Sequence, residues 1–261
     1  MITTIEQGID ATVKLLKNAQ NILFITGAGI SADSGLPTYR GIGGLYETKD
    51  TEDGIPVEMA LAGEMLATRP EITWKYLAQI EHNCRHTTFN TAHRIIAQMD
   101  AHFKRVLVFT QNVDGFHTAA GSKNVIEIHG NFHNLKCMRC DWKKTVIDYN
   151  GLTFPPQCPA CNSIVRPDVV FFGEMLDEIK IQLFLDALYQ GFDLYFWIGT
   201  TGVFPYIQRP IYDTRSSGRY AIEINPSETI LSPQMDIRIP LKAAEALPRI
   251  WERLVKSNEP F

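Results

Sequence analysis

Five short apolar segments along the chain are predicted to be buried β-strands. Their apolar residues are continuous rather than alternating, which is typical of parallel strands that are covered on both faces. They are residues 22–26, 106–110, 125–128, 194–198 and 220–224. Residues 4–19 instead carry apolar side chains at helical spacing and are predicted to form a helix that packs on the first strand. The pattern predicts an α/β fold with a parallel sheet.

Polar or glycine residues directly follow each of the five predicted strands. They are Gly27-Ala28-Gly29, Gln111-Asn112-Val113-Asp114, His129-Gly130, Gly199-Thr200-Thr201 and Asn225. In open parallel sheets, ligands bind beyond the carboxyl ends of the strands, and these ends all lie at one edge. The recurrence therefore predicts a nucleotide site there.

The segment after the first strand adds a phosphate-binding pattern. Gly27, Gly29 and Ala32 have the spacing of a dinucleotide turn, in which glycines allow close approach of a pyrophosphate and the next helix N-terminus favours an anion. A plain strand-to-helix turn also fits the pattern, because the acidic residue usual about 20 positions further on is not evident. Residues 37–44 are polar and glycine-rich, and are predicted to form a flap that carries Tyr39 and Arg40 over the ligand.

Residues 56–99 are predicted to be mainly helical. One helix opens at Pro56-Val57-Glu58, and a second begins near Pro70, where the missing N–H of proline costs little. A third begins at Asn90 and runs to Met99.

Four of the five cysteines form two C-x-x-C pairs. Cys137 and Cys140 are separated by seventeen residues from Cys158 and Cys161. Each pair can direct two thiolates at one tetrahedral centre, so the spacing predicts zinc. Four thiolates leave no position open for water, which makes the metal structural. The fifth, Cys84, is predicted to be a partly buried structural thiol.

Composition narrows the classes of partner and location. The 261-residue chain contains 45% hydrophobic residues. Its net charge is −4 and its longest basic run is Lys143-Lys144, so nucleic acid is not expected as a partner. No apolar run approaches the ~20 residues of a membrane span, and the N-terminus does not have the pattern of a signal peptide. Together with the cysteine usage, these features favour a compact cytoplasmic enzyme, and a monomer is the favoured state.

Several motifs together resemble one family. GAGISADSGLPTYRG, TQNVDGFH, IHGNF, the four cysteines and RPDVVFFGE occur in the order found in the sirtuins, the NAD-dependent protein lysine deacylases. The resemblance implies a discontinuous Rossmann-like domain (residues 1–40, 85–135 and 165–261), a cofactor loop with a helical insert (41–84) and a zinc module (136–164). It also implies that NAD is consumed to remove an acyl group from lysine, giving nicotinamide and O-acyl-ADP-ribose.

The resemblance also implies roles for individual residues. Those implied to bind NAD are Gly27, Ala28, Gly29, Ser31, Asp33, Pro37, Thr38, Tyr39, Arg40, Gln111, Asn112, Val113, Asp114, His129, Gly199, Thr200, Thr201, Asn225 and Ala243. Those implied to bind an acyl-lysine peptide, as an added strand with an acyl pocket, are Val113, Phe132, Val170, Phe171, Phe172, Gly173, Glu174 and Val203. Asn112 and His129 are implied to be catalytic.

His129 is the candidate general base. A neutral imidazole can accept the proton of a ribose hydroxyl at neutral pH, and this hydroxyl attacks the acyl carbon after nicotinamide has left. By position alone, His129 could equally be a hydrogen-bonded core residue. Asp114 has a similar alternative as a helix N-cap, and residues 171–174 are, by their pattern, the end of a buried strand.

The sequence departs from the sirtuin pattern in three places. Tyr39 replaces the usual phenylalanine, and the loop from Gly199 to Pro205 has Thr201 for the usual serine and is one residue shorter. Sirtuins that prefer succinyl or malonyl groups carry a tyrosine and an arginine where this chain has Leu77 and Ile80. Without a cation, a buried acyl carboxylate would be unpaired, so neutral acyl groups, acetyl first, are expected.

Other functions remain as alternatives. An NAD-dependent protein ADP-ribosyltransferase would use the same NAD residues, and a catalytically idle NAD sensor or scaffold would be compatible with the altered 199–205 loop. Intact Asn112, Asp114 and His129 disfavour the idle protein. A dehydrogenase is disfavoured by the missing acidic residue, and a zinc-ribbon nucleic-acid binder by the net charge.

Overall fold

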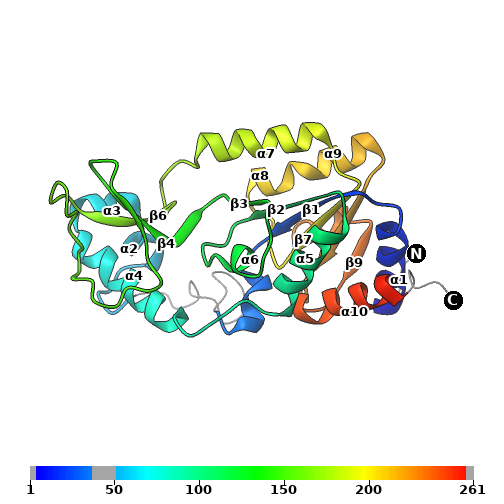
Figure 1. Ribbon diagram of the computed structural model, residues 1–261, viewed down its shortest axis with the longest axis horizontal. Helices are drawn as coiled ribbons and strands as arrows, with labels where there is room; N and C mark the ends of the chain where they lie inside the picture. The colour runs from blue at the N-terminus through cyan, green and yellow to red at the C-terminus, as the bar shows by residue number, and fades with distance from the viewer. Residues whose placement is uncertain (1–3, 37–50, 257–261) are drawn as a thin grey trace.

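A six-stranded parallel sheet forms the centre of the larger lobe (Figure 1). The computed structural model describes residues 4–36 and 51–256. The strand order is β3 (Val125–Glu127), β2 (Arg105–Thr110), β1 (Asn21–Thr26), β7 (Leu194–Ile198), β8 (Tyr220–Ile224) and β9 (Ile237–Ile239). The five predicted strands are confirmed to within one residue at either end. β9 was not predicted.

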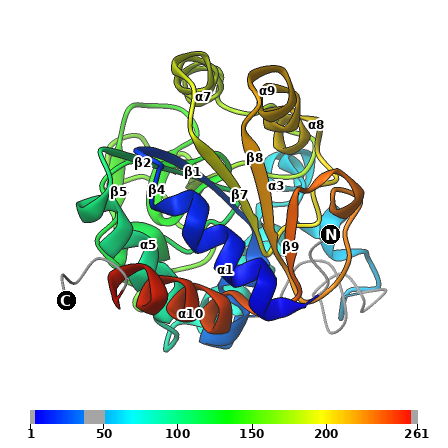
Figure 2. The same cartoon turned by 90° about the vertical axis from the view of Figure 1, so that its right-hand side faces the viewer.

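Helices cover both faces of this sheet (Figure 2). One face packs on α1 (Ile5–Leu16), α5 (Thr91–His102) and α10 (Ala243–Lys256), and the other on α7 (Glu178–Gln190), α8 (Pro205–Gln208) and α9 (Pro210–Ser217). Ile22 and Phe24 of β1 belong to the first core, whereas Leu23 and Ile25 belong to the second. Burial on both sides explains why the strands are continuously apolar.

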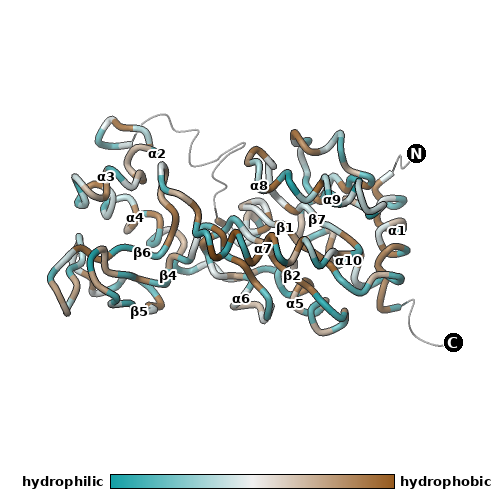
Figure 3. The backbone as a smooth tube through the Cα atoms, turned by 90° about the horizontal axis from the view of Figure 1, so that it is seen from above, coloured by the Kyte–Doolittle hydropathy of each residue, from teal (hydrophilic) through white to brown (hydrophobic). Residues whose placement is uncertain are grey.

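A smaller lobe joins a three-stranded antiparallel sheet to helices from an earlier part of the chain (Figures 1 and 3). Its sheet order is β5 (Lys143–Thr145), β4 (Gly130–Cys137) and β6 (Val165–Val169), and its helices are α2 (Val57–Ala60), α3 (Gly63–Thr68) and α4 (Pro70–Cys84). The predicted helix starts near Pro56, Pro70 and Asn90 are confirmed. Trp74 is fully buried in this lobe, and its indole donates to the carbonyl of Val165 at 2.9 Å.

The strand predicted to end at residues 171–174 is shorter than expected. β6 stops at Val169, and Phe172 makes an isolated bridge to Ala62. The backbone of Phe172 exchanges hydrogen bonds with Leu61 and Gly63, of 3.1 and 3.0 Å. This segment therefore joins the two parts of the smaller lobe.

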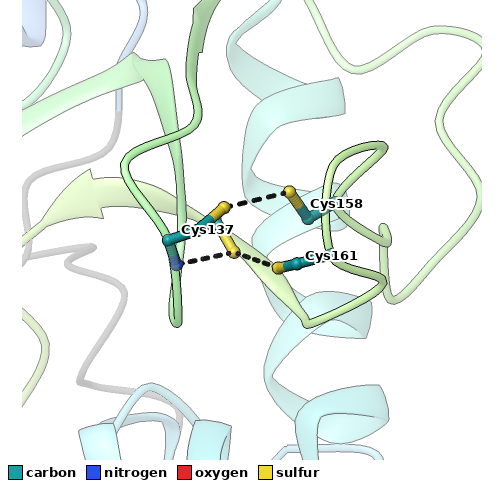
Figure 4. Close-up of side chains that lie close together, drawn as sticks. Cys137, Cys158 and Cys161 are labelled. Carbon is teal, nitrogen blue, oxygen red and sulfur yellow. Dashed lines mark hydrogen bonds between the residues drawn. The ribbon is translucent and has the colours of Figure 1, made fainter.

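The four paired cysteines lie together at the end of the smaller lobe's sheet (Figure 4). Their sulfur atoms lie within 4.8 Å of one another, with Sγ separations of 3.5 Å for Cys137 and Cys161 and 3.6 Å for Cys140 and Cys158. A tetrahedral zinc centre with bonds of about 2.3 Å places its sulfurs about 3.8 Å apart. The donor set and its spacing fit the predicted structural zinc.

No helix within residues 4–36 and 51–256 is long and apolar enough to cross a bilayer.

Zinc removal is expected to destabilise the smaller lobe. Cys158 is fully buried, so Cys158→Ser should abolish stoichiometric zinc and lower Tm by on the order of 10 °C, because the metal contributes folding free energy. Elemental analysis and thermal unfolding measure both. Cys84→Ser, which removes a thiol outside the cluster, is the matched control and should retain one zinc per chain. Full zinc content in Cys158→Ser would contradict the assignment.

Two buried histidines make stability depend on pH. His117 Nε2 lies 2.9 Å from the hydroxyl of Thr26, and its ring centroid is 4.8 Å from that of His93. Burial lowers the pKa of His117 well below its ordinary value and the pKa of His93 to about 4. Between pH 6.5 and 4 the unfolded chain therefore binds more protons than the folded protein, so stability falls as the pH falls through this range.

For His93 alone, the loss between pH 7 and pH 5 should be about 2 kcal/mol in the free energy of unfolding. Urea unfolding at both pH values measures it. His93→Asn should reduce the difference between the two pH values, even if it lowers stability at both. His86→Asn changes an exposed histidine and should not alter the difference. An unchanged pH difference in His93→Asn would refute this account.

Candidate functional site

The main cavity lies at the carboxyl edge of the parallel sheet, between the two lobes. It has a volume of about 660 Å³. The larger lobe contributes residues that follow β1, β2, β7 and β8, and the smaller lobe contributes Leu61, Leu77 and the segment from Val169 to Glu174. The predicted ligand edge and the predicted peptide segment therefore border one cavity.

A backbone contact between the ends of β1 and β7 forms the floor of this cavity. The N–H of Gly29 donates to the carbonyl of Gly199 at 2.8 Å. A Cβ on Gly29 would lie 2.6 Å from the Cα of Gly199. A Cβ on Gly27 would lie 2.8 Å from the carbonyl oxygen of Gly199. The loop after β7 therefore requires glycine at both positions. The sequence had suggested only that a ligand requires them.

The expected helix after the glycines is absent from this stretch. Residues Ala28–Ile30 and Ala32–Ser34 form two 3₁₀ turns, separated by Ser31. The predicted helix N-terminus at this position was therefore wrong. Gly35, with φ of +87°, ends the second turn.

Asn112, Ser31 and Asp114 form a hydrogen-bonded cluster beneath the cavity. The amide of Asn112 donates to the carbonyl of Gly27 at 3.2 Å and to the Ser31 hydroxyl at 3.1 Å. Ser31 in turn donates to Asp114 Oδ2 at 2.7 Å, while Asp114 Oδ1 accepts from the N–H of Phe116 at 3.0 Å. Burial raises the pKa of Asp114, and the bonds from Phe116 and Ser31 partly offset it. The carboxylate thus accepts an N–H at the start of α6 (Phe116–Ala119) as well as a side-chain hydroxyl.

Gln111, Thr200 and Asn225 connect three strand ends. Gln111 Nε2 donates to the Thr200 hydroxyl at 2.8 Å and to the carbonyl of Thr26 at 3.2 Å. Asn225 Nδ2 donates to the carbonyl of Thr200 at 3.2 Å. Gln111, Thr200 and Asn225 line the cavity, whereas Thr26 does not.

His129 presents a neutral imidazole to the cavity. Its Nδ1 lies 2.8 Å from the carbonyl of Gln111, which can only accept, so Nδ1 carries the proton and Nε2 holds the lone pair. Burial and the charge of Lys180 lower the pKa of His129, whereas the Gln111 carbonyl raises it. The net effect is a lowered pKa. A neutral ring whose Nε2 carries no proton at pH 7 is the form that a general base requires.

The smaller lobe supplies an apolar wall. Val113, Phe132, Val170, Phe171, Phe172 and Gly173 line the cavity together with Glu174. The carboxylate of Glu174 is held by Arg166 at 2.5 and 2.8 Å and by the N–H of Phe171 at 3.0 Å. Glu174 therefore fixes the shape of this segment.

A smaller adjoining cavity of about 110 Å³ contains a buried ion pair that the sequence did not reveal. Ser31, Asn112, Asp114, Val113 and Phe132 line it together with Ile80, Glu81 and Arg85. Arg85 donates to both carboxylate oxygens of Glu81, at 3.0 and 2.5 Å, and also to Asn150. Glu81 lies in α4, and Arg85 directly follows this helix. Their separation of four residues places both side chains on one face of the helix, and this spacing could have revealed the pair in the sequence.

Three predicted residues whose positions are described, Asp33, Ala243 and Val203, do not line the main cavity. Asp33 pairs with Lys242 at 2.9 Å, and Ala243 is buried at the start of α10. Val203 is 39% exposed on the 199–205 loop. Pro37, Thr38, Tyr39 and Arg40 lie outside the described residues, as does the rest of the predicted flap.

The lining also includes residues that the sequence analysis missed. They are Leu176, Phe204, Tyr206, Lys242 and the loop Pro226, Ser227, Glu228 and Thr229. The loop follows Asn225 directly, so its place after a strand was a usable signal. No signal in the sequence pointed to Tyr206, because its contact with His129 depends on the fold.

Comparisons with known proteins agree with this geometry. The Sir2 family profile matches residues 27–205. The chain is 46% identical over 238 residues to "NAD-dependent protein deacylase 2" of Pseudomonas syringae pv. tomato, covering 90% of this chain and 96% of the relative. It is 43% identical over 252 residues to the protein of the same name from Pseudomonas aeruginosa, covering 95% and 98%.

Solved structures are also similar over nearly the whole chain. A Sir2 homologue in complex with NAD has a TM-score of 0.84 at 31% identity, covering 95% of this chain and 94% of that one. A complex of Sir2 with a p53 peptide and NAD⁺ has a TM-score of 0.80 at 28% identity, covering 94% and 98%. The fold, the cavity at the sheet edge and the sequence likeness lead to one conclusion: this chain belongs to the Sir2 family.

Proposed function

We propose that this protein is an NAD-dependent protein lysine deacylase, which transfers an acyl group from lysine to ADP-ribose and releases nicotinamide. The observation that carries the proposal is the neutral imidazole of His129, whose Nε2 faces a cavity bordered by both lobes. The relatives named as NAD-dependent deacylases and the Sir2 complex with NAD support it.

The carboxyl edge of the sheet would bind NAD. Backbone and side-chain groups of Gly27 to Gly29, Thr200, Thr201 and Asn225 would contact the phosphates and the adenosine. The amides of Gln111 and Asn112 and the carboxylate of Asp114 would orient the nicotinamide half, since they can hold hydroxyls and a carboxamide. His129 would accept the ribose hydroxyl proton at Nε2.

The smaller lobe would bind the acyl-lysine peptide. A solved structure of a Sir2 protein holds a p53 peptide together with NAD⁺. Here the backbone N–H groups of Phe171 and Phe172 donate to Glu174 and Leu61 within the chain. An added peptide strand would therefore pair first at Gly173, opposite Val203, and its lysine would extend between Val113, Phe132 and Val170.

The acyl group itself would be neutral. Leu77 and Ile80 present hydrocarbon to the two cavities, and the nearby cation Arg85 is already neutralised by Glu81. A succinyl or malonyl carboxylate would have to compete with Glu81 for this guanidinium or remain unpaired, which is costly in a buried site. Acetyl groups carry no such cost.

Nicotinamide release is expected to require both the acylated peptide and NAD. His129→Ala should lower production of O-acyl-ADP-ribose by at least about 100-fold, because it removes the base. Mass spectrometry of the products measures this. His82→Ala, which changes an exposed histidine of α4, is the control and should be as active as the unmodified protein. Equal nicotinamide release with and without acylated peptide, or ADP-ribose attached to the peptide, would contradict a deacylase.

Acetylated peptides are expected to react faster than matched succinylated peptides. Glu81→Gln should leave Arg85 without its carboxylate partner, and should therefore raise the ratio of desuccinylation to deacetylation roughly tenfold, equivalent to about 1.4 kcal/mol. Steady-state kcat/KM values with both peptides give the ratio. Glu64→Gln, on α3 and outside both cavities, is the matched control. Faster desuccinylation by the unmodified protein would refute the preference.

A further inference from the structure

The only nitrogen with which His129 can accept a proton is already hydrogen-bonded. Nε2 lies 2.8 Å from the hydroxyl oxygen of Tyr206. Because the carbonyl of Gln111 fixes the ring proton on Nδ1, Nε2 must accept and the Tyr206 hydroxyl must donate. An imidazole nitrogen has a single lone pair in the ring plane. A substrate hydroxyl cannot use it directly unless Tyr206 moves away.

The ring of Tyr206 is held on three sides by aromatic contacts. It stacks on Phe204, with centroids 5.5 Å apart and planes at 11°, and meets the edge of Phe109 at 6.3 Å and 80°. His129 lies at 6.2 Å and 87° to it. Tyr206 also lines the main cavity. Tyr206 thus borders both the imidazole and the space that the substrate would occupy.

Tyr206 directly follows the 199–205 loop. Pro205 begins the short helix α8, and Tyr206 is its second residue. The loop is secured by Gln208, whose amide donates to the carbonyl of Gly202 at 2.9 Å, and the backbone of Ile207 accepts from the indole of Trp197 at 2.9 Å. These contacts fix α8 against the sheet and leave the ring of Tyr206 little freedom to swing.

We propose that Tyr206 is a catalytic residue that relays the proton from the substrate ribose to His129. The relay rests on the proposed function and on His129 as its base. As the ribose oxygen bonds to the acyl carbon of the imidate, the π electron pair of the C=N bond shifts to the lysine nitrogen, the ribose O–H bond breaks and the proton passes to Tyr206 Oη. The proton of Tyr206 passes at the same time to His129 Nε2. The phenol is regenerated, and the imidazole becomes an imidazolium that still donates from Nδ1 to Gln111.

The relay acts only after nicotinamide has left, which gives it a specific kinetic signature. Tyr206→Phe keeps the ring contacts but removes the hydroxyl. It should lower acyl transfer by about 100-fold, as for other lost acid–base groups, while exchange of labelled nicotinamide into NAD remains within about twofold. Tyr195→Phe is the matched control, because it removes another buried hydroxyl, one bonded to the N–H of Phe192 and outside the cavity. It should leave both rates unchanged.

Each outcome decides between the relay and its alternatives. Unchanged or faster acyl transfer in Tyr206→Phe would mean that the hydroxyl only occupies Nε2, and would overturn the relay. An equal loss of exchange and acyl transfer would mean a structural role and would also overturn it. Acyl transfer that persists in His129→Ala would instead refute the proposed base. An inactive His129→Ala beside a fully active Tyr206→Phe would refute the relay alone.

A second measurement needs no variant. The relay moves two protons in one step, and mixtures of light and heavy water can count the protons that move in a rate-limiting step. The rate of single-turnover acyl transfer by the unmodified protein should therefore be a quadratic function of the deuterium fraction, giving a bowed plot. A straight line, indicating one proton in flight, would overturn the relay.

Discussion

The contact between the ends of β1 and β7 determines the geometry of the whole ligand edge. Gly29 and Gly199 approach so closely that a Cβ on Gly199 would lie 2.4 Å from the N–H nitrogen of Ile30. Gly199 also has φ of +57°, which any other residue would adopt at a cost. With these two loops in contact, the side chains of Gln111, Asn112 and Asn225 can each bond to a neighbouring strand end. A rigid polar edge results, although the described residues directly after β1 form 3₁₀ turns and not an α-helix.

The smaller lobe turns this edge into a cavity, and its shape depends on buried charge and on the cysteine cluster. Arg166 is buried, contacts both oxygens of Glu174 and lies over the ring of Phe171 at 4.3 Å. Removing either partner would leave a charge unpaired in a partly buried site, which is costly. The pair therefore specifies how the 171–174 segment faces the sheet. The cysteines act further away, at the far end of β4 and in the loop before β6.

The sequence predicted most of the large lobe because its strands are buried on both faces. Their apolar runs are continuous, as expected of strands that are covered on both faces. β4 gave no such signal, since GNFHNLKC includes many polar residues and only three of its eight residues are buried. The cysteine spacing, by contrast, predicted a cluster directly, because four ligands of one metal constrain one another.

At the site, individual residue types were predictable but their partners were not. His129 was found by its position after a strand, whereas Tyr206 lies 77 residues further along and meets it only through the packing of α8. The glycines after β1 were predicted to allow close approach of a pyrophosphate, and in the structure the backbone of Gly199 approaches them. Asp33 and Ala243 were carried over from a motif, and the fold directs the Asp33 carboxylate to Lys242.

His129 occupies the point where the chain passes from one lobe to the other. Ile128 is tied to the large sheet, by donating to the carbonyl of Thr110 at 3.0 Å, and His129 itself accepts from the N–H of Val170 beside β6 at 2.8 Å. Gly130 begins β4 with φ of +86°, and a Cβ there would lie 1.9 Å from the carbonyl oxygen of Asp168. The backbone of this residue is thus fixed by both lobes, so a change in their relative position would move the imidazole against its partners. Its ring bridges Gln111 after β2 and Tyr206 of α8, which makes the lone pair of Nε2 sensitive to the packing of both elements.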